Sequence, residues 1–272
     1  MTDQASPPDF RYDEIATGYA RYWGSVIRPS AVAVLDLITP EPTARVIDIG
    51  TGTGSLGIAA LERWPAIEVV GIDASRGMLQ VADAEADRRL RGARRRRFST
   101  AVAPADELPF EDGSFDIAIS SFVLQLVPNR TAALREARRV VRPGGRLAWV
   151  SWLVGRDRYR GDEIADEVLD EFGFDPPEAE PRTDFASAAA AAAATRKAGF
   201  RHVSARSGML EHAWSAEDYR AFFTEFDEQS LFADLEADER ERIEATLLDR
   251  LRRLTPDELT LRLPIVYVTG EA

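Results

Sequence analysis

The sequence predicts a doubly wound α/β fold, in which a mainly parallel sheet carries helices on both faces. Residues 46–49 form an apolar run interrupted by one acid, and such a run is typical of a strand buried on both faces. A turn with glycines at positions 50, 52 and 54 follows it, and residues 55–63 have helical composition. The apolar segment 68–72 then ends in Asp73. This alternation of strand, turn and helix predicts βαβ units.

Size and composition restrict the classes of function. The chain has 272 residues, of which 45% are hydrophobic, enough for one large α/β domain with an insertion. Its net charge of −12 disfavours nucleic acid and anionic membranes as partners. There is no cysteine for disulfides, and two histidines are too few for a histidine-rich site, so we expect no metal. No apolar run approaches a membrane span of about 20 residues, and the polar N-terminus does not resemble a signal peptide. A soluble, cytoplasmic protein is therefore expected.

The chain begins with a polar tail, and residues 10–28 form the first expected helix. This helix is rich in aromatic side chains, and Tyr12, Ile15 and Tyr19 share one face at helical spacing. It either packs against the domain as an ordinary surface helix or forms a lid over the site. Residues 30–38 then form a helix that leads into the first strand.

Two interpretations of the glycine turn are open, and Asp48 distinguishes them. The stretch from Gly52 to Gly57 satisfies the dinucleotide pattern G-x-G-x-x-G, and Asp73 lies about 20 residues further on, as this pattern requires. However, Gly50 occupies the first position after the strand, where that pattern would place its own first glycine. A carboxylate at position 48 would also face a bound pyrophosphate, which is unfavourable, whereas it suits a ligand that carries positive charge.

Residues 48–54, with the pattern D-x-G-x-G-x-G, resemble the first motif of the class I S-adenosylmethionine-dependent methyltransferases. Residues 105–110 and 112–116 are similar to the A-E-x-L-P-F and D-G-S-F-D segments of quinone-biosynthesis C-methyltransferases, which carry a methyltransferase type 11 domain. Residues 134–145 are similar to the L-x-E-x-x-R-V-L-x-P-G-G segment of the same family. The resemblance implies a Rossmann-like seven-stranded sheet, whose last strand runs antiparallel between strands five and six. It also implies S-adenosylmethionine as cofactor and S-adenosylhomocysteine as product.

The resemblance further implies roles for individual residues. The three glycines let the cofactor approach the backbone, and Asp48 lies near its amino-acid end. Asp73 binds the two ribose hydroxyls, unless it only caps the next helix. Pro104 stands where the family has the Asp that binds the adenine amine, so either Asp106 or the backbone N–H of Ala105 is expected to replace it. The predicted cofactor-binding residues are Asp48, Gly50, Thr51, Gly52, Gly54, Asp73, Ala74, Met78, Ala105, Asp106 and Ser120.

The later elements complete the sheet and add an insertion after strand five. Further strands are expected at residues 98–102, 117–121, 146–152, 199–207 and 261–269, and helices at 82–97, 131–141, 162–172, 186–198, 215–226 and 235–254. We divide the chain into a tail and lid helix (1–30), a cofactor-binding core (31–154), a cap insertion (155–183), and a part (184–272) that completes the sheet and contains a helical insertion at about 215–255. The arginine-rich end of the helix at 82–97 forms either a solvated face paired with nearby acids or a phosphate-binding cluster.

Methyl transfer from a sulfonium depends on alignment of the acceptor and exclusion of water rather than on a dedicated catalytic triad. His212 is the one candidate base that we expect outside a strand, and Tyr19 is placed to polarise an acceptor. These two are the candidate catalytic residues. The expected substrate pocket consists of Tyr19, Trp23, Phe122, Gln125 and Trp152. Its aromatic character indicates a small, apolar or aromatic acceptor.

Two other classes of function stay open. A nicotinamide-dependent oxidoreductase would use the turn from Gly52 to Gly57, and a regulatory protein would keep the cofactor fold without turnover. After its fourth expected strand the chain lacks the Asn/Asp-Pro-Pro-aromatic motif of enzymes that methylate adenine or cytosine amines. A small-molecule substrate is therefore the expected partner. A homodimer is compatible with the sequence, which does not specify the oligomeric state.

Overall fold

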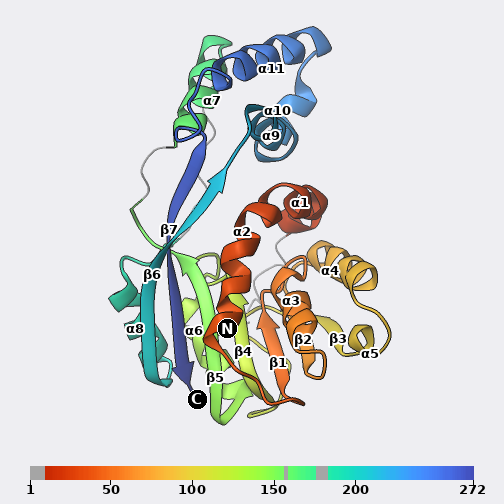
Figure 1. The fold of residues 1–272 in the computed structure, drawn as a ribbon, viewed down its shortest axis with the longest axis vertical. Coiled ribbons are helices and arrows are strands. Elements are labelled where there is room, and N and C mark those ends of the chain that lie inside the picture. The colour runs from red at the N-terminus through yellow and green to blue at the C-terminus, as the bar shows by residue number, and fades with distance from the viewer. Residues whose placement is uncertain (1–9, 156–158, 176–182) are drawn as a thin grey trace, which may run out of the picture.

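A seven-stranded sheet forms the centre of the computed structural model, which describes residues 10–155, 159–175 and 183–272 (Figure 1). The strands are β1 (Arg45–Ile49), β2 (Glu68–Asp73), β3 (Phe98–Val102), β4 (Phe115–Ser121), β5 (Val141–Trp152), β6 (Arg201–Ala213) and β7 (Thr260–Glu271). Their spatial order is β3-β2-β1-β4-β5-β7-β6. The first five strands are parallel, and β7 runs antiparallel between β5 and β6, as predicted.

The strand order reverses between β1 and β4, and this reversal defines where a ligand can bind. β1 pairs with β2 on one side and with β4 on the other. The chain continues outward from β1 through β2 to β3 and then returns to β4. In doubly wound sheets, ligands bind beyond the carboxyl ends of the strands at such a reversal. The glycine turn follows β1 and therefore lies at this point.

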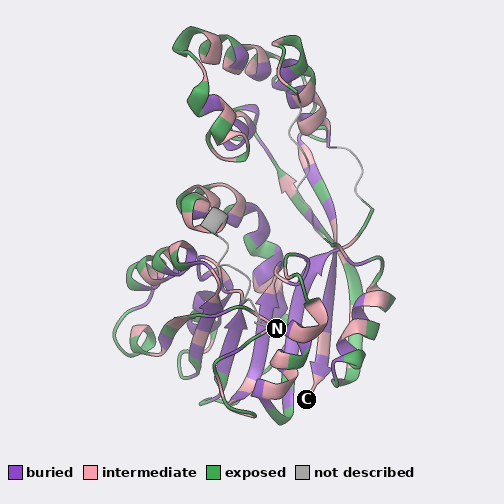
Figure 2. Ribbon diagram, turned by 180° about the vertical axis from the view of Figure 1, so that it is seen from behind, coloured by how far each residue is buried: buried purple, intermediate pink, exposed green. Residues whose placement is uncertain are grey.

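Helices cover both faces of the sheet (Figure 1). One face carries α3 (Ser55–Arg63) and α4 (Arg76–Arg89), and the other carries α6 (Arg130–Val140) and α8 (Ala188–Lys197). Val46 packs among side chains on the α3 face and Ile47 among those on the α6 face, and each is at most 1% exposed. The buried central strands are evident in Figure 2. Burial on both faces explains why residues 46–49 are almost uniformly apolar.

The first two helices have bounds that differ from the prediction, which expects one helix at residues 10–28 and another at residues 30–38. They are α1 (Phe10–Arg21) and α2 (Trp23–Val32), separated at Tyr22, and a short 3₁₀ helix, η1 (Ala33–Leu37), follows them. A Cβ atom on Gly24 would lie 3.2 Å from the carbonyl oxygen of Tyr19, so a glycine allows the close approach of the two helices. Aromatic spacing does not reveal this break, because both helices keep the period of 3.6 residues.

The charged helix expected at residues 82–97 also has different bounds. α4 begins before it, and a separate short helix, α5 (Ala93–Arg96), follows. Gly92 lies between them with a φ of 57°, a left-handed conformation that glycine adopts at little cost. The arginine-rich composition concealed this boundary, since arginine favours helix on either side of it.

β6 and β7 extend beyond the other strands (Figure 1). β5 pairs with β7 only as far as Trp152↔Ile265, whereas the pairing of β6 with β7 continues to Ala213↔Thr260. We call residues 209–213 and 260–264 the arm. The expected end of this strand at residue 207 is therefore wrong. Most of β6 is exposed or half-buried, so its sequence lacks the alternation that would have revealed its length.

The arm carries a helical cap made from two separate insertions. Its elements are α7 (Arg160–Glu171), α9 (Ala216–Phe222), the π-helical turn η2 (Phe223–Asp227), α10 (Gln229–Asp234) and α11 (Ala237–Leu251). The hydroxyl of Tyr219 donates to Asp162 at 2.8 Å, and Arg250 pairs with Glu171 at 2.6 Å, which joins the two insertions. Residues 156–158 and 176–182 of the predicted cap insertion, and 1–9 of the predicted tail, lie outside the described residues. Within the described part of the chain, no helix has the length and apolar character that a bilayer span requires.

Candidate functional site

The glycine turn after β1 is left-handed at all three glycines. Their φ angles are 69° at Gly50, 53° at Gly52 and 81° at Gly54. A Cβ atom on Gly50 would lie 2.2 Å from Val123, and one on Gly54 would lie 2.9 Å from Ile58. A Cβ atom on Gly52 would meet nothing within 4 Å. Gly50 and Gly54 therefore let the protein pack closely, whereas Gly52 leaves open space over the backbone.

Asp48 supports this turn from the core. It is fully buried, and its Oδ2 accepts hydrogen bonds from the hydroxyl of Thr51 at 2.7 Å and the N–H of Gly57 at 2.9 Å. Its Oδ1 is buried without a hydrogen-bond partner among the described residues. Burial raises the pKa of Asp48 to about 7, and the nearby charge of Asp73 acts in the same direction. A cationic ligand over the turn would favour the ionised carboxylate.

The burial of Asp48 leads to a prediction about pH. A carboxyl whose pKa is raised on folding stabilises the native state fully below about pH 3.8, and this contribution is lost as the pH rises through about 7. Replacing Asp48→Asn leaves the position neutral at every pH. We expect the variant to gain on the order of 3 kcal/mol relative to wild type between pH 4 and pH 8. Urea denaturation of both proteins at these pH values measures the difference, and a constant difference would contradict the raised pKa.

Asp73, at the end of β2, connects the glycine turn to the start of α4. Its Oδ2 accepts from the N–H of Gly52 at 2.9 Å, and its Oδ1 accepts from the N–H of Ser75 at 3.0 Å. Ser75 is the N-cap of α4, because its Oγ accepts from the N–H of Met78 at 3.0 Å. The alternative in which Asp73 only caps this helix is thus not the observed arrangement. Each carboxylate oxygen retains a lone pair for a further donor such as a ribose hydroxyl.

The residues predicted around the adenine lie next to Asp73. The N–H of Ala103 donates to the carbonyl of Asp73 at 3.0 Å, which places the segment after β3 beside the end of β2. Ala105 and Asp106 lie in the turn of this segment and are half-buried. Ala74 precedes α4, and Met78 in its first turn is 3% exposed. The structure therefore brings this group together, while the contact of each residue with adenine stays a prediction.

The end of β4 carries a strained residue held by buried hydrogen bonds. The φ of Phe122 is 56°, a conformation unfavourable for a bulky side chain. Gln125 donates from Nε2 to the carbonyl of Phe122 at 2.5 Å and accepts from the hydroxyl of Ser151 at 2.6 Å. Ser120 donates to the carbonyl of Ile49 at 2.8 Å. The predicted pocket residue Gln125 is thus 3% exposed, and its side chain is engaged by the protein.

Aromatic side chains from the sheet, the N-terminal helices and the cap meet beside this strand end. The rings of Phe122 and Trp152 have centroids 4.2 Å apart, those of Trp152 and Trp23 6.3 Å, and those of Trp23 and Phe222 5.8 Å. Phe222 also packs against Trp214 at 5.1 Å. We call these five residues the aromatic cluster. Three of them, Trp23, Phe122 and Trp152, belong to the predicted substrate pocket.

Tyr19 lies near this cluster, and His212 lies in the arm. Tyr19 faces Phe226 of η2 at 6.3 Å, and its burial and the nearby Tyr12 and Asp73 raise its pKa. His212 is a residue of β6, so the expectation that it lies outside a strand is wrong; the pairing of the arm extends through this position. Its ring packs against Trp214 at 4.3 Å, and burial lowers its pKa.

Sequence reasoning missed three polar residues of this region: Asp13, Ser75 and Ser151. Asp13 on α1 accepts hydrogen bonds from Ser75 and Gly77 at the start of α4. A serine three residues before Met78 is a helix-start signal that could have identified Ser75. Asp13 and Ser151 act across long sequence separations and have no local signature.

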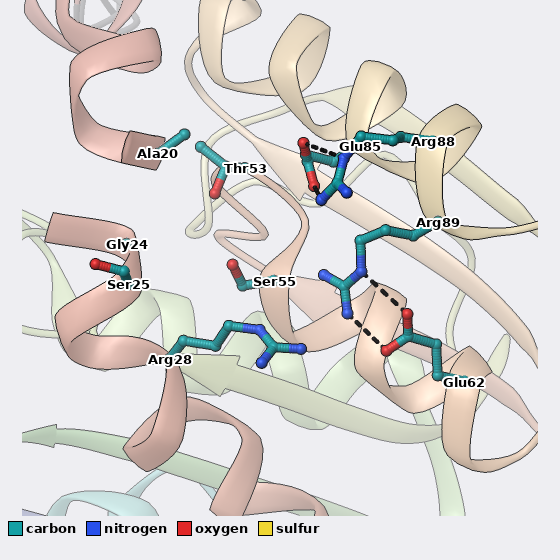
Figure 3. A pocket seen from close by; sticks show the side chains of 10 residues that line it. All are labelled: Ala20, Gly24, Ser25, Arg28, Thr53, Ser55, Glu62, Glu85, Arg88 and Arg89. Carbon is teal, nitrogen blue, oxygen red and sulfur yellow. Dashed lines mark hydrogen bonds and ion pairs between the residues drawn. The ribbon is translucent and has the colours of Figure 1, made fainter. Parts of the chain in front are cut away.

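A cavity of about 520 Å³ lies between α2, α3 and α4 (Figure 3). It is lined by Ala20, Gly24, Ser25, Arg28, Thr53, Ser55, Glu62, Glu85, Arg88 and Arg89. Arg89 donates twice to Glu62, at 3.0 and 2.6 Å, and Arg88 donates twice to Glu85, at 3.1 and 2.6 Å. These pairs support the solvated-face interpretation of the basic cluster over phosphate binding. Asp73 and Trp152 do not line this cavity, so we assign neither cofactor nor acceptor to it.

Comparison with known sequences gives matches over about half of the chain and a match over nearly the whole chain. A family model described as a methyltransferase domain matches residues 47–149. Nocamycin O-methyltransferase of Saccharothrix syringae is 30% identical over 280 residues, which cover 95% of this chain and 96% of that protein. The ubiquinone/menaquinone biosynthesis C-methyltransferase UbiE of Dinoroseobacter shibae is 37% identical over 152 residues, or 54% of this chain and 55% of that protein. The chain thus spans about half the length of the quinone C-methyltransferases that it matches.

Solved structures with 18–20% identity share the fold. YcgJ of Bacillus subtilis has a TM-score of 0.55, with 91% of this chain and 96% of that chain covered. Phosphoethanolamine N-methyltransferase 2 of Haemonchus contortus, in complex with S-adenosyl-L-methionine, has a TM-score of 0.58, with 98% and 60% covered. The [4+2]-cyclase SpnF has a TM-score of 0.59, with 92% and 82% covered. At this identity the likeness concerns the fold alone.

Proposed function

The chain belongs to the S-adenosylmethionine-dependent methyltransferases, and we propose that it transfers the methyl group to a small apolar or aromatic acceptor. S-adenosylmethionine is its cofactor, and S-adenosylhomocysteine is the product that the cofactor becomes. The observation that carries the proposed acceptor class is the aromatic cluster beside the end of β4. Phe122 and Trp152 lie at the carboxyl ends of the central strands β4 and β5, Trp23 lies in α2, and Phe222 lies in the cap. Side chains from three parts of the chain would therefore surround the acceptor.

The residues around the glycine turn fit this cofactor. The open space over Gly52 accommodates a ligand against the backbone, and Asp73 would accept hydrogen bonds from the ribose hydroxyls. Asp48, with one buried oxygen lacking a partner among the described residues, would favour the positive charge of the cofactor from below the turn. Ala74, Met78, Ala105 and Asp106 would border the adenine, and Gly50, Gly54, Thr51 and Ser120 would keep the turn and strand end in shape.

The protein would contribute mainly alignment and exclusion of water. The bound cofactor supplies an electrophilic methyl group. Because its pKa is raised, Tyr19 would stay protonated and orient the acceptor as a hydrogen-bond donor. Because its pKa is lowered, His212 would be neutral near pH 7 and able to accept a proton, but its place in the arm makes it the weaker candidate.

The lengths over which the chain matches its named relatives support a proposal for the atom that receives the methyl group. The relative that matches over nearly the whole chain is an O-methyltransferase, whereas the named C-methyltransferase matches over about half. We therefore favour a hydroxyl oxygen on the apolar acceptor, and an aromatic carbon is the second candidate. A homodimer and a cytoplasmic location stay predictions.

Parallel calorimetric titrations with S-adenosylhomocysteine, S-adenosylmethionine and NADH test the cofactor class. We expect the first two to bind and NADH not to bind, because the carboxylate of Asp48 would face its pyrophosphate. Incubation with methyl-tritiated cofactor and a panel of phenols, enols and reduced quinones then tests the acceptor. Label in an extractable apolar product is expected. Transfer only to polar amines would contradict the proposed acceptor, and tight NADH binding alone would favour the oxidoreductase.

A further inference from the structure

We propose that Asp13 is a positioning residue that couples the docking of α1 to the binding of the cofactor at Asp73. The inference rests on the proposed role of Asp73 in holding the ribose. The sequence is compatible with α1 either as an ordinary surface helix or as a lid. The proposal adds that the position of α1 is thermodynamically coupled to the cofactor site.

A continuous chain of hydrogen bonds connects α1 to the glycine turn. Oδ1 of Asp13 accepts from the hydroxyl of Ser75 at 2.5 Å and from the N–H of Gly77 at 2.7 Å. The N–H of Ser75 donates to Oδ1 of Asp73 at 3.0 Å, and Oδ2 of Asp73 accepts from the N–H of Gly52 at 2.9 Å. A shift of α1 therefore removes an acceptor from the residue that holds Asp73 in place. Ligand contacts that fix Asp73 would in turn favour the docked position of α1.

Gly77 shows that the contact of α1 with α4 is close as well as polar. A Cβ atom at this position would lie 2.6 Å from the carbonyl oxygen and 2.7 Å from the Cα of Asp13. These are backbone atoms, so they cannot move away without displacement of α1. Glycine is a weak helix former, and its presence in the first turn of α4 is explained by this approach.

The opposite side of α1 contacts the cap, so a displacement of α1 would affect the acceptor region as well. A Cβ atom on Gly18 would lie 2.9 Å from the ring of Phe226 in η2, and the ring of Tyr19 faces the same side chain. Arg21 pairs with Glu225 of η2 at 3.4 Å. Helix α1 is thus held between α4, beside Asp73, and the cap. This position connects both halves of the proposed site.

The charge of Asp13 is maintained by its surroundings. The hydroxyl of Ser75 and the N–H of Gly77 lower the pKa of Asp13, so its carboxylate stays ionised at neutral pH. Both donors lie at the N-terminus of α4, where the helix dipole also favours a negative charge. The contact is therefore at full strength under the conditions in which the cofactor would bind.

Coupling between two sites is reciprocal, and this gives the proposal a measurable consequence. Bound S-adenosylhomocysteine should slow amide hydrogen exchange in α1, and any change that displaces α1 should weaken S-adenosylhomocysteine. Two variants weaken the contact of α1 with α4 by different means. Gly77→Ala adds a helix-favouring methyl group that collides with the backbone of Asp13, and Asp13→Asn removes the charge with little change of shape.

The test compares exchange in α1, with and without S-adenosylhomocysteine, and its dissociation constant by calorimetry. In wild type we expect slower exchange in α1 on binding. In both variants we expect faster exchange in the free protein and a dissociation constant raised about tenfold. Glu14→Gln, on the exposed side of the same helix, is the matched control and should behave as wild type. If Gly77→Ala does not fold, Asp13→Asn carries the test alone.

The outcomes separate this proposal from the proposed function. If S-adenosylhomocysteine binds wild type but leaves exchange in α1 unchanged, or binds both variants with wild-type affinity, the coupling is wrong and the cofactor assignment stands. If it does not bind wild type at all, the proposed ribose site fails. If Glu14→Gln weakens binding as much as Asp13→Asn, the effect belongs to the net charge of α1, and the role of Asp13 is overturned.

Discussion

Asp73→Ala is expected to raise the dissociation constant for S-adenosylhomocysteine at least about 100-fold, which corresponds to about 2.7 kcal/mol. Two causes add. The variant loses a carboxylate that would accept from the ribose hydroxyls, and hydrogen bonds to a charged group contribute about 1.5–3 kcal/mol each. It also releases the N–H of Gly52, which Asp73 holds at 2.9 Å, so the turn loses part of its support. Isothermal titration calorimetry measures the affinity, and thermal denaturation measures whether the fold is kept.

Asp116→Ala is the matched control for this prediction. Asp116 also lies on a central strand, but at the start of β4, away from the glycine turn. Its carboxylate accepts hydrogen bonds from the side chain of Arg142 at 2.6 Å and from the backbone N–H of Arg45. Loss of this partly exposed ion pair should lower stability slightly and leave affinity unchanged. Unaltered binding by Asp73→Ala, or equal weakening in both variants, would refute the ribose assignment.

Gly50→Ala is expected to impair mainly stability and Gly52→Ala mainly cofactor affinity, although both glycines are left-handed. At Gly50 a Cβ atom would lie 2.2 and 2.7 Å from the two methyl groups of Val123, and the backbone would be strained as well. We expect a loss of about 2–4 kcal/mol in the free energy of unfolding. At Gly52 the strain costs about 1–2 kcal/mol, and the new methyl group meets nothing within 4 Å.

The methyl group of Gly52→Ala would instead occupy the space proposed for the cofactor. We therefore expect this variant to fold with a modestly lower melting temperature. We expect it to bind S-adenosylhomocysteine at least about 100-fold more weakly, because the ligand can no longer lie close to the protein backbone at this position. Chemical denaturation and calorimetry on both variants separate stability from affinity. Wild-type affinity in Gly52→Ala would show that the space over this turn does not hold the cofactor.

The sheet and the cofactor region could be predicted because their signals are local. The run at residues 46–49, the glycine turn and the start of α3 are consecutive, so their order alone indicates where the turn lies in the fold. Asp73 could be connected with them because parallel strands present their carboxyl ends at one edge of the sheet. The antiparallel place of β7 came from the family resemblance, since no pattern in residues 261–269 specifies strand direction.

The remaining features depend on contacts between distant residues. Asp13 and Ser75 are separated by 62 positions, and Gln125 and Ser151 by 26, so neither pair leaves a pattern in a short window. Asp48 was expected to act on the cofactor, yet its contacts with Thr51 and Gly57 show that it also supports the turn itself. The length of β6 was underestimated because Leu210 is the one buried residue among residues 209–213, which is too few apolar positions to indicate a strand.

The two-stranded arm also has a consequence for how such an enzyme can diversify. The second insertion of the cap, which contains α9 to α11, leaves the sheet between Gly208 and Ile265, a cross-strand pair at which the chain goes out and returns side by side, whereas α7 enters the cap separately after β5. An exchange of the intervening segment would therefore need only two junctions, both in regular antiparallel geometry, and neither would interrupt the glycine turn or Asp73. We expect such an exchange to alter the proposed acceptor region while the proposed cofactor residues stay in place, as long as the new segment still packs against α7.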